Sequence, residues 1–467
     1  MSSTRTEKDM LGEVSVPENA LWGIHTHRAV ENFGEAVRPV PSAMIRAYGY
    51  VKLACASVNR ELGKLDEDVA AALIQACEEM AAGELDEHII VECLQGGAGT
   101  SLNMNVNEVL ANRALQLIGE RPGNYSRIDP FDHVNLHQST NDTYPTALKV
   151  AALFELTRLE DTVTALLESF QDAEKKFASL GKVGRTQFQD AVPVTLGREM
   201  GAYAEAFARD RWRIFKCRER IRTVNLGGTA IGTGITAPRR YVFRVTDKLR
   251  ELTSLPVARA ENLVDATQNL DQFVEVSGIL KALAADLIKI SNDLRLLASG
   301  PRAGLAELRL PTRQEGSSIM PGKVNPVMPE FAAQAGMAVY GFDGMLSHAV
   351  AMGSLELNAF VPLVSWSLLS SIDLLARACD GLCTRCVVGI EANEEVLSRT
   401  LRSSTAAAVM LVSVLGHEKA SQIARAAVER GQPLEHAVLE SELLSKEEWE
   451  MLIQPQRLNS LGEPPKP

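Results

Sequence analysis

The sequence predicts an all-α protein built around five long helices. Aromatic residues make up only 5% of the 467 residues while alanine and leucine are abundant, a composition that favours helices over sheets. Long helical patterns dominate the middle of the chain, at residues 144–178, 196–224, 268–298, 329–352 and 362–388. These lengths exceed those of ordinary globular helices, so the five together predict a five-helix bundle.

The third of these segments carries a regular apolar stripe. Its members recur at alternating spacings of three and four residues: Leu280, Leu283, Leu287, Ile290, Leu294 and Leu297. Val276, Ile279 and Ile288 lie off this stripe and are apolar too. Because a helix that is apolar on more than one face needs more than one neighbour, we expect the bundle to bury part of its surface against other subunits.

Shorter elements flank the bundle. Amphipathic patterns at residues 66–80 and 103–118 predict short helices in the N-terminal third, and a small unit of short helices begins after about residue 393. We therefore expect a mostly helical N-terminal domain over residues 1–139 and a small helical C-terminal domain over residues 396–467. The long-helix domain between them, residues 140–395, carries the loop described below.

Composition excludes several classes of function. A net charge of -11 argues against a nucleic-acid surface, and no run of lysine and arginine suggests a membrane surface. The N-terminus lacks an apolar segment and we find no run of about 18 apolar residues, so we expect a soluble cytoplasmic protein. Seven cysteines imply no disulfide framework, and the pair Cys383 and Cys386 is expected to be buried as small apolar residues rather than to bind metal.

The most informative segment is residues 316–326, which reads Gly-Ser-Ser-Ile-Met-Pro-Gly-Lys-Val-Asn-Pro. Glycine and proline fix an irregular backbone, and loops of fixed shape are where binding and catalytic groups concentrate. Lys323, with Asn325 two residues later, can hold a carboxylate by charge and by directed hydrogen bonds. The nearby serines can stabilise a second negative charge. The alternative is an ordinary polar loop between two helices.

Four more segments are rich in small polar residues: 96–105, 137–142, 184–187 and 225–234. Each alone has a simpler explanation, since residues 139–142 would cap the helix that follows, and the glycines of 225–234 would serve close backbone packing. Together they supply the hydroxyl, amide and N–H donors that a small dicarboxylate needs. His25 and His27 are the nearest approach to a metal-ligand pair, and we expect neither a metal nor a cofactor.

These motifs resemble those of the aspartase/fumarase superfamily along nearly the whole chain. The resemblance includes the loop, the four polar segments and the stretches at 11–13, 16–17, 23–26, 28–29, 31–33 and 356–358. It implies an all-α, three-domain fold in which the bundles of four subunits form a shared core. The expected assembly is therefore a homotetramer, with active sites that combine loops from three subunits and bind a small dicarboxylate.

Roles carried over by matching position form one site. Ser317 would be the general base, and Lys323 and Asn325 would bind the α-carboxylate, with Ser318 beside them. Four hydroxyls would hold the other carboxylate: Thr100, Ser101, Ser139 and Thr140. Asn141, Thr186 and Gln187 would line the leaving-group side. Glu330 and His137 would support these residues. His137 stands where the family commonly has serine, so it could instead alter substrate scope or pH dependence.

Three local features favour elimination of ammonia from L-aspartate over hydration of fumarate. Residues 325–330 and the alanine at 392 match the aspartate-specific branch in this resemblance. Gln187 stands where hydratases carry a histidine, and an amide cannot donate a proton as an acid. The expected reaction is thus L-aspartate to fumarate and ammonia, by anti β-elimination through an enediolate. The alternatives are a fumarate hydratase, a lyase for a substituted aspartate, or a non-catalytic scaffold protein.

Overall fold

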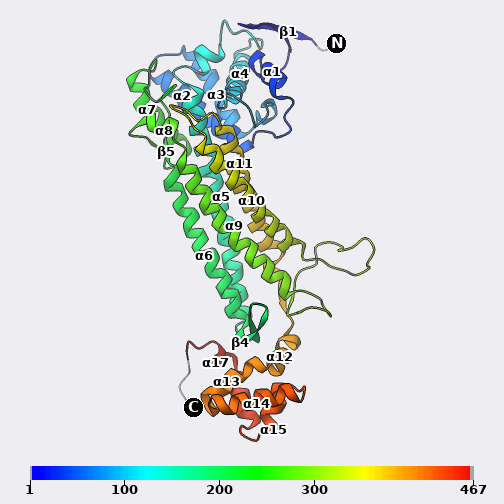
Figure 1. The fold of residues 1–467 in the computed structure, drawn as a ribbon. Coiled ribbons are helices and arrows are strands. Elements are labelled where there is room, and N and C mark those ends of the chain that lie inside the picture. Colours follow the sequence, from blue (N-terminus) through cyan, green and yellow to red (C-terminus); the bar gives the residue numbers. More distant parts are fainter. Residues whose placement is uncertain (1–2, 463–467) are drawn as a thin grey trace. The chain divides into compact units, whose positions relative to one another are not determined.

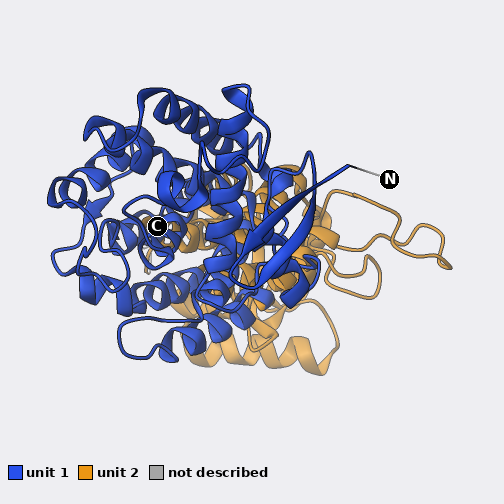
Figure 2. Cartoon of the chain, turned by 90° about the horizontal axis from the view of Figure 1, so that it is seen from above, with its two compact units in different colours: residues 1–160, 213–282, 338–374 blue, residues 161–212, 283–337, 375–467 orange. Residues whose placement is uncertain are grey.

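The computed structural model describes residues 3–462, and helices dominate them. Within this range the chain forms seventeen α-helices and eight short strands, and the strands pair only in two-stranded sheets. The prediction of an all-α protein is confirmed (Figure 1). The chain divides into two compact units, coloured separately in Figure 2. Unit 1 holds residues 1–160, 213–282 and 338–374, and unit 2 holds residues 161–212, 283–337 and 375–467.

Unit 1 begins with a hairpin and a layer of short helices. These elements are β1 (Thr4–Asp9), β2 (Gly12–Pro17), α1 (Ile24–Phe33), α2 (Ser42–Glu61), α3 (Glu67–Ala82), α4 (Thr100–Leu117), α7 (Arg239–Thr253) and α8 (Leu263–Gln268). The short strands β5 (Thr223–Val224) and β6 (Ala258–Arg259) pair in parallel. The helices predicted at 66–80 and 103–118 are confirmed as α3 and α4. The hairpin of β1 and β2 was not predicted.

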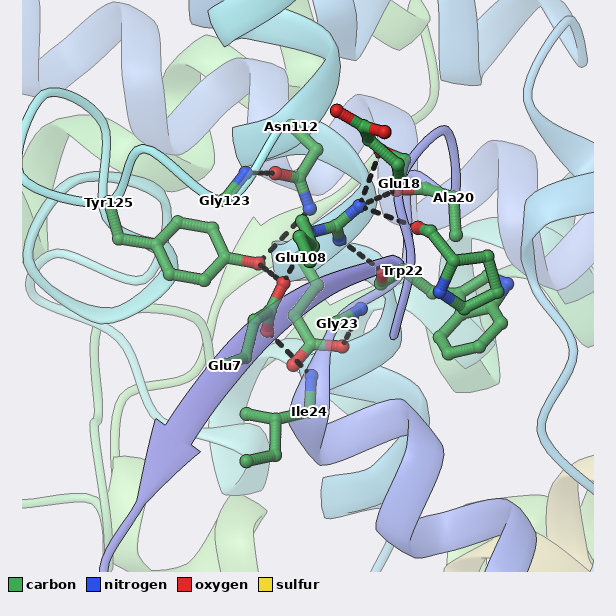
Figure 3. Close-up of polar contacts among 12 residues, drawn as sticks. Glu7, Glu18, Ala20, Trp22, Gly23, Ile24, Glu108, Asn112, Gly123 and Tyr125 are labelled. Carbon is green, nitrogen blue, oxygen red and sulfur yellow. Dashed lines mark hydrogen bonds and ion pairs between the residues drawn. The ribbon is translucent and has the colours of Figure 1, made fainter. Parts of the chain in front are cut away.

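A buried carboxylate caps the first helix of unit 1 (Figure 3). Glu108 of α4 accepts hydrogen bonds from the backbone N–H groups of Gly23 and His25, at 2.8 and 2.7 Å. Thr26 adds its own N–H and its hydroxyl. Because the first N–H groups of a helix have no partner inside it, Glu108 satisfies donors that would otherwise be buried unpaired. Burial raises the pKa of Glu108.

Five long helices pass from one unit into the other: α5 (Thr140–Lys176), α6 (Leu196–Ile221), α9 (Asp271–Leu297), α10 (Val327–Ala351) and α11 (Val361–Arg385). They confirm the five predicted helices to within a few residues. All six members of the predicted stripe on α9 are buried, and so is Val276. The largest difference is at the start of α5, which begins at Thr140 instead of 144.

Specific contacts join these helices inside each unit. In unit 1, Arg158 of α5 pairs with Asp373 of α11 at 2.8 Å, and Ser277 of α9 donates to Asp343 of α10 at 2.8 Å. In unit 2, the rings of Phe170 on α5 and Phe207 on α6 stack with centroids 5.6 Å apart. Each unit therefore holds its own section of a bundle, as predicted from the sequence.

One helical segment, Val361–Gly389, has the length and composition to cross a membrane. It contains α11, and its most apolar 18-residue window has a mean hydropathy of 1.2. We expected no run of about 18 apolar residues, and serines and aspartates do interrupt the apolar run of this segment. In the structure 67% of that window is buried, as in the core helix of a bundle.

Unit 2 also contains a hairpin and the C-terminal helices. The hairpin is β3 (Gly181–Thr186) with β4 (Gln189–Thr195), and β7 (Leu308–Arg309) pairs with β8 (Glu391–Ala392). The helices are α12 (Glu394–Ser403), α13 (Val409–Leu415), α14 (His417–Glu429), α15 (Leu434–Glu440), α16 (Lys446–Leu452) and α17 (Pro455–Leu458). They pack around the fully buried Trp449. The three domain boundaries drawn from the sequence stay a prediction. All seven cysteines, including Cys383 and Cys386, are buried and free.

A buried lysine in α5 makes stability depend on alkaline pH. Lys149 is 3% exposed, and its Nζ donates to the carbonyl oxygen of Thr223 at 2.6 Å. Burial lowers its pKa to about 8 from 10.5. Between these values the native state has released the proton and the unfolded state still binds it, so this group makes stability rise with pH, by up to about 3 kcal/mol.

We therefore expect Lys149→Met to remove that rise. In the wild type, burial of the charged lysine costs stability, and this cost is present in full below pH 8. The variant avoids the cost, so its stability advantage over the wild type shrinks as pH increases. The measurement is thermal denaturation of both proteins between pH 7 and 10. The difference in Tm, variant minus wild type, should fall over this range; melting curves that shift in parallel would contradict the assignment.

Candidate active site

The starts of helices α4 and α5 meet in unit 1 and carry four of the predicted substrate-binding hydroxyls. Thr100 and Ser101 open α4, while Ser139 and Thr140 lie at the start of α5. Thr143 of α5 donates to the amide oxygen of Asn103 on α4 at 3.3 Å, which joins the first turns of the two helices. Helix N-termini present free N–H groups and partial positive charge, so this junction favours an anion.

Ser139 caps α5. Its hydroxyl accepts the N–H of Asn141 at 3.2 Å, and its own N–H donates to the Asp142 carboxylate at 3.0 Å. This reciprocal pair satisfies donors at the helix start and explains why α5 begins at Thr140. The capping explanation for residues 139–142 is confirmed. Thr100, the half-buried Ser101 and Ser139 all lie at the junction of the two helix starts.

Asp142 also holds the glycine-rich segment 225–234 against the start of α5. Its Oδ2 accepts the N–H groups of Gly227 and Thr229 at 3.1 and 2.9 Å. Burial raises the pKa of Asp142 to about 6. Gly232 has a φ of +90°, and a Cβ there would lie 2.4 Å from the backbone of Leu263. The prediction that these glycines serve close backbone packing is confirmed.

Asn141 and His137 contact different segments of unit 1. The Asn141 amide donates to the carbonyl oxygen of Ala230 at 2.7 Å. His137 has a φ of +62°, and its Nδ1 lies 2.8 Å from Oδ1 of Asn59 on α2. Its ring lies 5.3 Å from that of Tyr241, and burial lowers its pKa. A role in support of the site stays a prediction for His137.

Thr186 and Gln187 lie in unit 2, at the tip of the hairpin of β3 and β4. Thr186 pairs with Gln189, so Gln187 and Phe188 form a two-residue turn. Both have positive φ values, 54° and 60°, as the tight turns of twisted hairpins require. Positive φ in residues other than glycine or asparagine is strained, and such strain concentrates at functional sites. Gln187 and Phe188 are exposed at this tip.

The predicted signature loop belongs to unit 2 and lies between α9 and α10 along the chain (Figure 1). Its neck is closed by Gly316, whose N–H donates to the carbonyl oxygen of Lys323 at 2.8 Å. The Asn325 amide donates to the carbonyl oxygen of Gly316 at 2.7 Å. A Cβ at Gly316 would lie 2.5 Å from that same Lys323 oxygen, so only glycine fits the neck.

Within the loop, Ser317 is the acceptor of two backbone N–H groups. Ile319 and Met320 donate to its Oγ at 3.2 and 2.9 Å. Lys323 and Ser318 are exposed, and Asn325 is partly exposed. Glu330 lies in the first turn of α10, 4.0 Å from the Arg295 guanidinium. Two N–H groups on one hydroxyl oxygen would stabilise negative charge there.

Two residues that build this site, Lys52 and Asn135 of unit 1, were missed by sequence reasoning. Asp142 and Asn225 lie in the predicted polar segments, but no individual role was predicted for them. Asn225 donates to the carbonyl oxygen of Asn141 at 3.0 Å. A charged residue inside the apolar pattern of α2 was the one available signal for Lys52. Among residues 3–462, no group of three or more His, Cys, Asp and Glu side chains has the arrangement of a metal site.

Comparison with known families decides the class of the chain. A family model described as "Lyase" matches residues 12–341, and one described as "Fumarase C C-terminus" matches residues 408–460. The chain belongs to the lyase family. Its fold and motifs are those of the aspartase/fumarase superfamily, so the resemblance inferred from the sequence is confirmed.

Full-length relatives of this lyase-family chain are known. The aspartate ammonia-lyase of Bacillus sp is 42% identical over 461 residues, which cover 99% of this chain and 98% of the relative. That of Escherichia coli (strain K12) is 41% identical and covers 98% and 96%.

Solved structures share the fold. The fumarate lyase:delta crystallin from Brucella melitensis, bound to cobalt, superposes with a TM-score of 0.93 at 44% identity and covers 98% of this chain and 100% of its own. The class II fumarase from Schistosoma mansoni has a TM-score of 0.87 at 29% identity and covers 97% and 99%.

Proposed function

We propose that this protein is an aspartate ammonia-lyase, a carbon–nitrogen lyase that converts L-aspartate reversibly to fumarate and ammonia. The observation that carries the proposal is full-length similarity to several bacterial aspartate ammonia-lyases, at 41–43% identity. The substrate is accordingly a small dicarboxylate.

The two helix starts in unit 1 supply donors for one substrate carboxylate. Thr100 and Ser101 contribute hydroxyls from α4, and Ser139 and Thr140 contribute hydroxyls from α5. Partial positive charge at both helix starts adds to these hydrogen bonds. Lys323 and Asn325 of the signature loop bind the α-carboxylate. The other carboxylate is attached to C3, so it gains negative charge as the enediolate forms, and the hydroxyls at the two helix starts stabilise that charge. Preorganised donors at such a position commonly contribute about 3–4 kcal/mol each.

Ser317 is the general base that removes the C3 proton. A serine hydroxyl is a poor base unless its deprotonated form is stabilised. The N–H groups of Ile319 and Met320 already point at the Ser317 oxygen and favour that form. The proton moves from C3 to Oγ to give the enediolate. The enediolate electrons then form the C2–C3 double bond as the C–N bond on the opposite face breaks and ammonia leaves.

The leaving-group side explains the preference for aspartate over malate. Gln187 presents an amide, which donates hydrogen bonds but cannot supply a proton. An ammonium group can leave as ammonia without protonation, whereas hydroxide is a poor leaving group without an acid. Thr186 and Asn141 complete this side. We propose that the exposed tip of the hairpin brings Gln187 to the substrate in the assembled enzyme.

We also propose a homotetramer, in the cytoplasm, in which long helices of four subunits pack together. Large apolar side chains on these helices are exposed in the single chain: Trp212 (63%), Phe215 (50%), Met337 (57%) and Tyr340 (47%). Large apolar side chains exposed in such number are typical of helices that pack against a partner. The division of the predicted site residues between separate loops is in keeping with sites completed by neighbouring subunits.

The test follows fumarate by its ultraviolet absorbance after purified protein is mixed with L-aspartate, with L-malate in a parallel cuvette. We expect fumarate from aspartate alone. Fumarate from malate alone would make this protein a hydratase and would require an acid other than Gln187. Absence of fumarate from both would overturn the proposal and direct the search to substituted aspartates, and then to a non-catalytic scaffold.

A further inference from the structure

A lysine buried in α2 lies between the two helix starts of the candidate site. Lys52 is 1% exposed. Its ammonium group donates to Oδ1 of Asn103 at 2.9 Å and to Oε1 of Gln138 at 2.8 Å. A third bond, to Oδ1 of Asn135, is 3.2 Å long. An ammonium group has three protons, so these three bonds use its full donor capacity.

The three acceptors come from the segments that carry the proposed substrate donors. Asn103 lies in α4, one turn after Thr100. Gln138 directly precedes Ser139 at the start of α5, and Asn135 lies three residues earlier. Asn135 accepts a further bond from the Asn103 amide at 3.2 Å. Lys52 therefore ties the two helix starts to each other and to α2.

Its acceptors are neutral amide oxygens, although the group is buried. Burial lowers the pKa of Lys52 to about 8, and Asp142 opposes that shift by its charge. A buried ammonium held only by amides costs stability compared with an apolar residue of the same length. Lys52 lies at an anion site, where its positive charge attracts a carboxylate. That function, and not stability, explains why a charge is buried here.

We propose that Lys52 is a positioning residue for substrate binding: it fixes the spacing between Thr100 and Ser101 on one side and Ser139 and Thr140 on the other, and so forms the pocket for one substrate carboxylate. The inference rests on the proposed function of those hydroxyls. Asn59, seven residues further on the same face of α2, strengthens the same platform, since its amide donates to the carbonyl oxygen of Leu136 at 3.2 Å.

The test is Lys52→Met, which keeps the length of the side chain and removes its donors. We expect KM for L-aspartate and the inhibition constant of succinate to rise together by about tenfold or more, as the loss of charge-assisted hydrogen bonds implies. kcat should also fall, because the carboxylate in this pocket gains negative charge as the enediolate forms and misplaced donors stabilise that charge less. Unchanged KM and succinate inhibition in the folded variant would overturn the inference.

Lys149→Met is the matched control, because Lys149 is equally buried in unit 1 with its pKa also lowered to about 8. It should alter the melting temperature without raising KM. If KM rises equally in both variants, the effect of replacing Lys52 is a general loss of packing. That result would contradict a positioning role.

A second pair of variants keeps the inference testable if Lys52→Met does not fold. Gln138→Met removes one acceptor and should by itself raise KM. Where Lys52→Met does fold, the rise in KM in the double variant should be smaller than the product of the two single rises. Independent effects would contradict action through Gln138. Ser139→Ala separates the two proposals: if KM does not rise there, the proposed carboxylate pocket is wrong; if KM rises there but not in the Lys52 or Gln138 variants, only the positioning role is wrong.

Discussion

Replacing Ser317 with asparagine is expected to lower kcat by about 10²–10⁴-fold, the usual contribution of a general base. Asparagine is more informative than alanine here, because its side-chain oxygen can accept the N–H groups of residues two and three positions later, as the serine oxygen does. The shape of the loop is then retained while the group that takes the proton is lost. KM should change much less than kcat.

Two comparisons make this result specific. Ser317→Ala removes both the base and the turn, so it should be at least as inactive as the asparagine variant. Ser421→Ala, at a partly exposed position on α14, should be indistinguishable from wild type. The measurement is initial fumarate formation from saturating L-aspartate, with circular dichroism to verify folding. Retention of wild-type kcat in Ser317→Asn would remove Ser317 from the role of base.

The second large effect is expected for stability, at Glu307 in unit 2. Glu307 is 1% exposed and pairs with Lys182 at 2.8 Å and with Arg185 at 2.7 Å. Lys182, also 1% exposed, makes a second pair with Glu199 at 2.7 Å. Removing one partner of a buried ion pair leaves uncompensated charge in the interior, which typically costs about 3–5 kcal/mol.

Glu307→Gln should therefore lower the first melting transition by about 10 °C, given roughly 2–4 °C per kcal/mol for units of this size. Glu391→Gln, at an exposed glutamate on β8, is the control and should shift melting by less than about 2 °C. Because Lys182 and Arg185 lie on the hairpin strand that ends at Thr186, the Glu307 variant should also raise KM for aspartate. Melting equal to that of the control would show that the charges of this network are compensated elsewhere.

Sequence reasoning located the long helices because their periodicity is strong over more than twenty residues. It placed the start of α5 late, because the reciprocal cap of Ser139 and Asp142 begins the helix before its first apolar residue. It missed the hairpin of β3 and β4, since the turn at Gln187 and Phe188 lacks the glycine or asparagine that normally signals such turns. The tertiary structure, and not the local sequence, maintains that turn.

The candidate site, like the fold, could be predicted from the sequence only in part. The donor-rich segments and the signature loop are visible in the sequence because their composition is unusual, and their roles came from family resemblance. Lys52 gave no comparable signal, because a single lysine in a helix is normally a surface residue. Its importance appears only when three separate segments, each distant from α2 along the chain, place amide oxygens around one ammonium group.

The sharing of all five long helices between the two units has a consequence for engineering the protein. The chain passes from one unit to the other inside α5, α6, α9, α10 and α11, so each passage falls within a continuous helix. A protease that cuts an exposed loop would leave the two units joined by intact helices. Neither unit can be expressed as a contiguous fragment, because each is made of three separate segments of the chain. Chimaeras with related enzymes that exchange one unit need five junctions, each placed within a helix whose packing must be preserved. Exchanges bounded by loops would instead replace parts of both units at once.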